Sequence, residues 1–165
     1  MPKHLAIIMD GNGRWAEKKG KNRIQGHSHG VKAVQEVVEE AVQLNIQYLT
    51  LYAFSTENWS RPQEEIGVLM KLLESTLKSE FQKLLKNRIK LNVIGNMHEL
   101  PAFVQKELEY VVEHTQDNND MTLTLALSYG GREELSYVFK QLATKVKNNI
   151  ISPEKIDQSI INEHL

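Results

Sequence analysis

Four short apolar runs alternate with longer amphipathic stretches along this chain, and that alternation constrains the fold more than any other feature. The runs cover residues 5–9, 48–54, 90–95 and 121–127. Each has the length of a strand, and the segments between them are long enough for crossover helices. We therefore expect an α/β fold, with right-handed βαβ units that form a parallel sheet with helices on both faces. The first run is uninterrupted, which predicts a strand buried on both faces.

The intervening segments predict helices at residues 31–44, 62–86, 100–115 and 133–147, and from 153 towards the end. Residues 16–30 are polar and interrupted by glycines, which favours a solvated loop, and residues 117–120 are expected to form a turn. The apolar stripe of residues 62–86 is broader than packing on a sheet requires. We expect a core helix there, with the wall of an apolar tunnel as the alternative.

Composition narrows the possible functions. The chain has 165 residues, which predicts a single domain, and its 20 Lys and Arg against 21 Asp and Glu leave a net charge of −1. This balance provides no overall positive field for nucleic acid, so an anion site has to be local. The chain has no cysteine and no apolar run of membrane-spanning length, so we expect a cytoplasmic protein.

Polar residues follow three of the expected strands, at 10–14, 55–61 and 128–132. In parallel sheets ligands bind beyond the carboxyl ends of the strands, so these segments are expected to meet in one crevice. Asp10, Gly11, Gly13 and Arg14 suit a cradle for diphosphate and Mg²⁺, because glycines admit close approach, arginine matches phosphate oxygens and a carboxylate beside phosphate needs a metal. A simple tight turn is the alternative. A dinucleotide site is disfavoured, because the acidic residue that its fingerprint requires roughly 20 positions later is missing.

Three motifs resemble the cis-prenyltransferases, the family of the undecaprenyl diphosphate synthases. They are Asp-Gly-Asn-Gly-Arg-Trp at 10–15 with Arg23 and Gly26-His27 downstream, Tyr-Ala-Phe-Ser-Thr-Glu-Asn-Trp-Ser-Arg-Pro at 52–62, and Tyr-Gly-Gly-Arg at 129–132. The resemblance runs from end to end of the chain. It implies that isopentenyl diphosphate is condensed onto farnesyl diphosphate with Mg²⁺ by a homodimer. The implied product is undecaprenyl diphosphate, the lipid carrier of cell-wall synthesis, which associates with the membrane. A location of the protein at the membrane periphery is therefore an alternative to a purely cytoplasmic one.

The resemblance also implies roles for individual residues. Asp10 would be the catalytic carboxylate that binds the metal and assists departure of the allylic diphosphate. Asn58 is the position assigned to the proton lost in condensation, and since an amide is a poor base, we expect it to orient isopentenyl diphosphate or relay the proton. The implied substrate-binding residues are Gly11, Asn12, Gly13, Arg14, Trp15, Arg23, His27, Ser55, Thr56, Glu57, Trp59 and Arg61. Residues 62–86 would line the tunnel for the prenyl chain, and the small Ala53 would leave it open.

The chain also departs from the family pattern. Family members continue well beyond residue 165, through a segment with further arginines, a second metal-binding glutamate and much of the dimer interface. We therefore expect a single domain at 1–165, a truncated copy with little synthase activity, and the alternative is a fragment that binds prenyl diphosphate without elongating it. Ser128 stands where many relatives have Asn, and we expect serine to be tolerated at this position. A haloacid-dehalogenase-like phosphatase is disfavoured because Asn12 replaces its second carboxylate, and residues 117–120 do not form the Asp-Asp-x-x-Asp motif of the trans-type enzymes.

Overall fold

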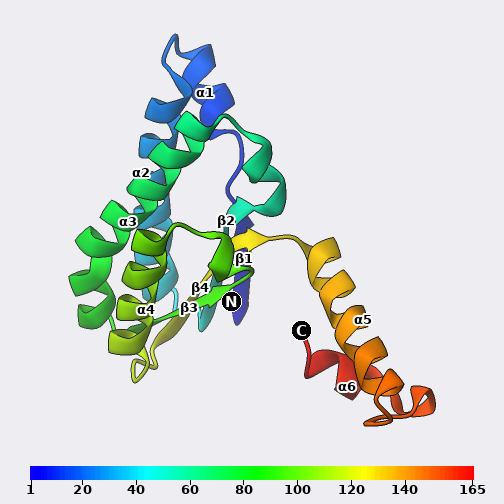
Figure 1. Cartoon of the computed structure of the whole chain (residues 1–165). Helices are drawn as coiled ribbons and strands as arrows, with labels where there is room; N and C mark the ends of the chain where they lie inside the picture. The colour runs from blue at the N-terminus through cyan, green and yellow to red at the C-terminus, as the bar shows by residue number, and fades with distance from the viewer. The chain divides into compact units, whose positions relative to one another are not determined.

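The computed structural model describes residues 1–165 and contains two compact units, residues 1–128 and 129–165. The first is built on four strands, β1 (His4–Ile8), β2 (Tyr48–Ser55), β3 (Ile89–Ile94) and β4 (Met121–Tyr129), in the order β1-β2-β4-β3 (Figure 1). β1 pairs with β2 and β3 with β4, both in parallel register. The expected parallel α/β class is confirmed, and each predicted strand forms within two residues of its expected bounds.

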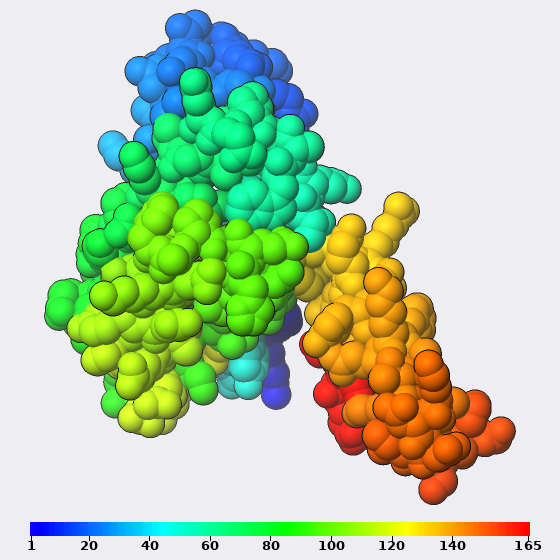
Figure 2. Space-filling model, in the orientation of Figure 1, coloured from blue at the N-terminus to red at the C-terminus, as the bar shows by residue number.

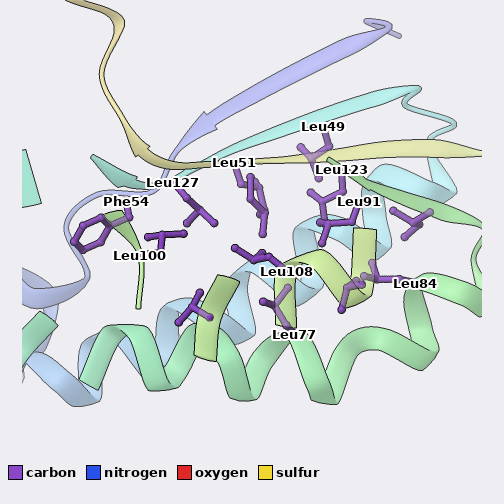
Figure 3. Close-up of a cluster of buried hydrophobic side chains, with 14 of the residues drawn as sticks. Leu49, Leu51, Phe54, Leu77, Leu84, Leu91, Leu100, Leu108, Leu123 and Leu127 are labelled. Atoms are coloured by element: carbon purple, nitrogen blue, oxygen red, sulfur yellow. The ribbon is translucent and has the colours of Figure 1, made fainter. Parts of the chain in front are cut away.

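Helices pack against one face of this sheet. They are α2 (Arg23–Gln43), α3 (Gln63–Lys86) and α4 (Ala102–Thr115), with the short α1 (Asn12–Lys18) and the 3₁₀ turns η1 (Thr56–Ser60) and η2 (Met97–Glu99) in the connections. Figure 3 shows Leu51, Leu91 and Leu123 on the sheet directed towards Leu77 and Leu108 on the helices. All five side chains are buried, and this cluster is the core of the first unit.

The opposite face of the sheet differs from the expectation. Along β2, β3 and β4, exposed or partly exposed polar residues alternate with buried apolar ones. Thr50, Asn92 and Thr124 are among these polar residues, and they lie on the face opposite the core. The second layer of helices is therefore not present within residues 1–128. The prediction that the first strand is buried on both faces is also wrong: β1 lies at the edge of the sheet, and Ile8 is 77% exposed. An apolar run indicates a strand but not its position in the sheet.

The segment expected to be a loop at residues 16–30 is largely helical. Lys18 ends α1, and α2 begins at Arg23, where the Asn22 side chain accepts hydrogen bonds from the backbone N–H groups of Ile24 and Gln25. Two of the glycines of this segment, Gly26 and Gly30, lie where α2 meets Asn12 of α1. A Cβ on Gly26 would lie 2.1 Å from the backbone oxygen of Asn12, so only glycine lets α1 approach α2 this closely.

The second unit contains α5 (Gly131–Lys147), the 3₁₀ turn η3 (Pro153–Lys155) and the short α6 (Gln158–Asn162). Val138 and Leu142 are its buried apolar side chains, and the Tyr129 hydroxyl donates a hydrogen bond to Glu134 (2.7 Å). The predicted helices at 133–147 and near the end are thus confirmed. None of the helices in the chain combines the length and the apolar character that crossing a lipid bilayer requires.

Candidate active site

A cavity of about 270 Å³ lies within the first unit, and its wall changes character along its length. One end is lined by polar residues that follow β1, begin α2 or follow β2. Most of the rest is lined by apolar side chains of α2, α3 and the sheet, among them Val34, Val38, Leu51, Ala53, Leu69, Leu72, Leu73, Leu77, Leu123 and Leu125. Polar residues near the far ends of α2 and α3, among them Glu39, Lys83 and Asn87, also belong to the wall. Such a combination suits a ligand with a charged head and a hydrocarbon tail.

The cavity extends along α3. The lining residues Leu69, Leu73, Thr76, Leu77 and Leu84 recur at helical spacing, so one side of the helix faces the cavity. From Leu69 to Leu84 the helix rises by about 22 Å, which is the length over which it borders the cavity. The broad apolar stripe of this segment thus contributes to the core and to a cavity wall at the same time.

The loop after β1 holds Asp10 at the polar end. Its carboxylate accepts hydrogen bonds from the Gly11 backbone N–H (2.5 Å) and from the Arg14 guanidinium (2.7 Å). The Arg14 hydrogen bond is the largest effect that lowers the pKa of the Asp10 carboxyl below its usual value, and the Gly11 hydrogen bond and the charges of Arg14 and Arg61 act in the same direction, so this group is ionised at neutral pH. Gly11 has a φ of 91°, in the left-handed region that favours glycine, and it turns the chain from β1 into α1.

Three further predicted residues gather around a carboxylate that the sequence analysis did not assign to the site. Glu65, in the first turn of α3, has oxygens 3.0 Å from Arg61 Nη1, 3.4 Å from His27 Nε2 and 3.7 Å from Arg23 Nε. Figure 2 shows the surfaces of these elements side by side, with α1 and the start of α2 in blue above η1 and the start of α3 in turquoise. The guanidinium of Arg23 also lies over Gly13, where a Cβ would approach it to 3.0 Å.

His27 is the most enclosed titratable group of this cluster. Burial lowers the pKa of its imidazole, and the Glu65 carboxylate acts in the opposite direction. Its Nε2 is buried at the cavity without a hydrogen-bond partner. A buried polar nitrogen without a partner costs stability, and a ligand with acceptor oxygens would satisfy it.

Asn58 lies in η1 and lines the cavity, but its amide oxygen already accepts a hydrogen bond from the Ser55 backbone N–H (3.1 Å). Asn58 and Ser55 form a reciprocal capping box, which fixes the turn after β2. The Asn58 amide nitrogen therefore provides donors rather than a base, as expected from the chemistry of an amide.

Five of the predicted substrate-binding residues do not line the cavity. They are Trp15, Ser55, Thr56, Glu57 and Trp59. Trp15 is 40% exposed on α1 and stacks on His29 (centroids 5.0 Å apart), while Ser55, Thr56 and Glu57 belong to the turn that carries Asn58. The structure therefore brings together Asp10, Gly11, Asn12, Gly13, Arg14, Arg23, His27, Asn58 and Arg61.

Trp59 attaches the η1 turn to the core instead. Its ring packs edge-on against Phe54 (4.9 Å between centroids), and its Nε1 donates to the Ser128 hydroxyl (2.8 Å). Ser128 is 2% exposed, donates a hydrogen bond to Glu99 and has a φ of 47°. Asparagine adopts such left-handed backbone angles more readily than most residues, and the expectation that serine is tolerated at this position stays a prediction.

The polar end and the apolar wall agree with what related proteins do. Residues 8–165 match the model of the family described as "Putative undecaprenyl diphosphate synthase". The chain is 48% identical over its whole length to an isoprenyl transferase of Chlorobaculum tepidum, of which it covers 62%. It is 46% identical to a farnesyl-diphosphate-specific ditrans,polycis-undecaprenyl-diphosphate synthase of Vibrio parahaemolyticus, of which it covers 66%.

A solved structure extends the agreement to three dimensions. The lavandulyl diphosphate synthase of Lavandula x intermedia, in complex with dimethylallyl diphosphate, superimposes with a TM-score of 0.95 at 34% identity, over 99% of this chain and 70% of that one. The fold is that of the α/β-type prenyltransferases. The chain belongs to the undecaprenyl diphosphate synthase family of cis-prenyltransferases, and it spans slightly less than two thirds of the length of the curated relatives it matches.

Proposed function

We propose that this chain binds farnesyl diphosphate, and that the protein carrying it elongates that substrate with isopentenyl diphosphate in cis configuration to undecaprenyl diphosphate. The observation that carries the proposal is the polarity of a single cavity. Arg14, Arg23 and His27 surround its polar end, and Leu73 and Leu77 belong to its long apolar wall. A diphosphate joined to a prenyl chain matches both parts, whereas a nucleotide would place polar groups against leucines.

The diphosphate would lie where glycine backbone and cationic side chains converge. Gly11 and Gly13 leave room for close approach, and the guanidinium groups of Arg14, Arg23 and Arg61 are suited to bidentate contact with phosphate oxygens. In the tautomer that carries its proton on Nε2, His27 would donate the hydrogen bond that this nitrogen does not make within the protein. These contacts hold the head group while the apolar wall excludes water from the tail.

Asp10 fits a role as a Mg²⁺ ligand. The chain has no group of three or more His, Cys, Asp or Glu side chains that could hold a metal alone. Mg²⁺ is commonly held by one carboxylate together with substrate phosphates, and the ionised Asp10 supplies that carboxylate beside the arginines. When bound, the metal would neutralise charge on the departing diphosphate.

In the reaction, the bond between the allylic carbon and the diphosphate oxygen breaks, a carbon–carbon bond to isopentenyl diphosphate forms, and the proton that isopentenyl diphosphate loses passes to an oxygen of the released diphosphate. Arg14, Arg23 and Arg61 would stabilise the negative charge that develops on the leaving group. Asn58 would orient the second substrate through its amide N–H donors, because its oxygen is held by Ser55. The growing chain would advance along the wall formed by α3.

Calorimetry with farnesyl diphosphate and Mg²⁺ tests binding by this chain. We expect saturable binding that weakens roughly tenfold or more in Arg23→Ala, since a charge-assisted hydrogen bond is lost. Arg88→Ala is the matched control, because Arg88 is an exposed arginine that pairs with Asp120 (3.1 Å) and does not line the cavity. Absence of binding, or equal losses in both variants, would overturn the proposed site.

Elongation is tested with radiolabelled isopentenyl diphosphate and the protein that contains this sequence. We expect long-chain polyprenyl diphosphate that depends on Mg²⁺ and on farnesyl diphosphate. Binding of farnesyl diphosphate without any elongation would favour the alternative, a module that binds prenyl diphosphate without extending it.

A further inference from the structure

Glu65 is a carboxylate at the centre of a site for an anion, which is unexpected on electrostatic grounds alone. Its side chain is only 13% exposed. Like charges repel, so by Coulomb's law a buried carboxylate next to a diphosphate site should weaken the binding of the diphosphate. The role of Glu65 therefore has to lie in its effect on the groups around it.

The three groups around Glu65 come from different parts of the chain. Arg23 and His27 are one turn apart near the start of α2, and Arg61 precedes α3 by two residues. Glu65 lies one turn after Arg61, and its two oxygens reach both elements. A carboxylate has about four acceptor positions, so one side chain suffices to orient several donors at once.

Orientation matters because these donors are on flexible side chains. An arginine has high rotamer entropy, which a ligand has to overcome if the side chain is not already held. The Arg23 side chain is 45% exposed and the Arg61 side chain 30%, so burial alone does not hold them. The ion pair with Glu65 restricts the Arg61 guanidinium (3.0 Å), and Arg23 lies between Glu65 (3.7 Å) and Glu17, to which its Nη1 donates a hydrogen bond (3.0 Å). His27 Nε2 lies beside them without a hydrogen-bond partner.

We propose that Glu65 is a positioning residue that orders Arg23 and Arg61, beside His27, for the diphosphate group of the substrate. The inference rests on the proposed function, in which these three side chains contact the diphosphate and Glu65 does not. The ordering of the cations outweighs the repulsion between the Glu65 carboxylate and the anion. Loss of the Glu65 charge therefore weakens the binding of diphosphate, opposite to the direction that Coulomb's law predicts for an isolated charge.

The test compares two substitutions that remove the same charge from adjacent positions. Glu65→Gln removes the central carboxylate, and Glu64→Gln removes an exposed carboxylate from the same first turn of α3 that has no ion pair in this structure. Calorimetry with farnesyl diphosphate and Mg²⁺ should show roughly tenfold weaker binding for Glu65→Gln, because Arg61 loses its ion pair and Arg23 keeps only the one with Glu17. Glu64→Gln should bind as the unaltered chain does, or slightly tighter.

A second measurement follows the His27 ring by nuclear magnetic resonance without any ligand. The groups that face this imidazole are Arg23 and Arg61, which lower its pKa, and Glu65, which raises it. The pKa of His27 should therefore fall in Glu65→Gln and stay unchanged in Glu64→Gln. A residue that only supports the fold would lower the melting temperature without moving this titration.

The outcomes separate this inference from the proposed function. If the unaltered chain does not bind farnesyl diphosphate, the proposed function fails, and the inference fails with it. If the unaltered chain binds but Glu65→Gln binds equally or more tightly, the inference is refuted and the proposed function stands. Weaker binding together with a lower His27 pKa and a melting temperature close to that of the unaltered chain supports the inference.

Discussion

The substitution Gly26→Ala tests whether close packing of α1 on α2 builds the polar end of the cavity. The added Cβ would lie 2.1 Å from the backbone oxygen of Asn12, 2.8 Å from its carbonyl carbon and 3.0 Å from Ala16 Cβ. Two of these three atoms belong to the backbone and cannot turn away as a side chain would. To reach the 3.4 Å of an ordinary contact, the helices have to separate by about 1.3 Å.

Two opposing effects set the size of the change. Overpacking of this kind typically costs about 1–3 kcal/mol, whereas alanine is favoured over glycine in a helix interior by about 1 kcal/mol. Since the clash is with backbone, we expect the upper part of that range and a net loss of about 1–2 kcal/mol. For a chain of this size, that lowers the melting temperature by roughly 2–8 °C.

Gly67→Ala is the matched control. Gly67 also lies in a helix interior, in α3, and a Cβ there would meet no atom within 4 Å. This substitution should therefore stabilise the protein by about 0.5–1 kcal/mol, the difference in helix propensity. Circular dichroism melts of both variants measure the change in stability, and calorimetry with farnesyl diphosphate measures the change in ligand affinity. Equal stabilisation by both substitutions, or unchanged ligand affinity in Gly26→Ala, would refute the packing argument.

Four other predictions concern the cavity and its supports. Asp10→Ala should reduce elongation about 10²–10³-fold, with a melting temperature close to that of the unaltered protein because the side chain is 74% exposed; near-normal turnover would contradict the proposed function. Leu73→Trp should shorten the prenyl product, as seen by chromatography, at little cost in stability, whereas Leu108→Trp, in the packed core, should cost about 1–3 kcal/mol. Ser128→Ala should lower the free energy of unfolding by about 1–3 kcal/mol, because the indole N–H that it binds loses its partner. Burial lowers the pKa of His27 in the folded chain, so the unfolded chain binds more protons just below pH 6.5. Acidification through that range should therefore lower the free energy of unfolding more for the unaltered chain than for His27→Gln, as measured by urea titrations.

The sequence predicts the fold well where apolar periodicity is strong. The bounds of β2, α3 and α4 agree with the expectation to within two residues. It fails at residues 16–30, where Gly26 and Gly30 were interpreted as loop residues. Both glycines face Asn12, and their spacing of four places them on one side of α2, where the start of α1 packs. Asn22, which caps α2, was the local signal that a helix begins there.

The candidate site was predictable to the extent that its residues lie next to strand ends. Asp10 and Arg14 follow β1 directly, and Arg61 follows β2 by six residues. Glu65 is not predicted as a site residue, because nothing local shows that α2 brings Arg23 and His27 to it. Contacts between residues about 40 positions apart depend on how helices pack, which the sequence pattern leaves open.

The change of polarity along the cavity follows from the topology. Parallel strands deliver their polar carboxyl ends to the same edge of the sheet, so Asp10 and Asn58 meet there although 48 residues separate them. The helix α3 begins at that edge and runs back along the sheet, and its inner side can be apolar because it faces only the core and the cavity. A ligand that enters by its tail therefore leaves its charged head at the strand ends. In the proposed reaction, the same arrangement would let the prenyl chain lengthen along α3 while its reacting end stays beside Asp10.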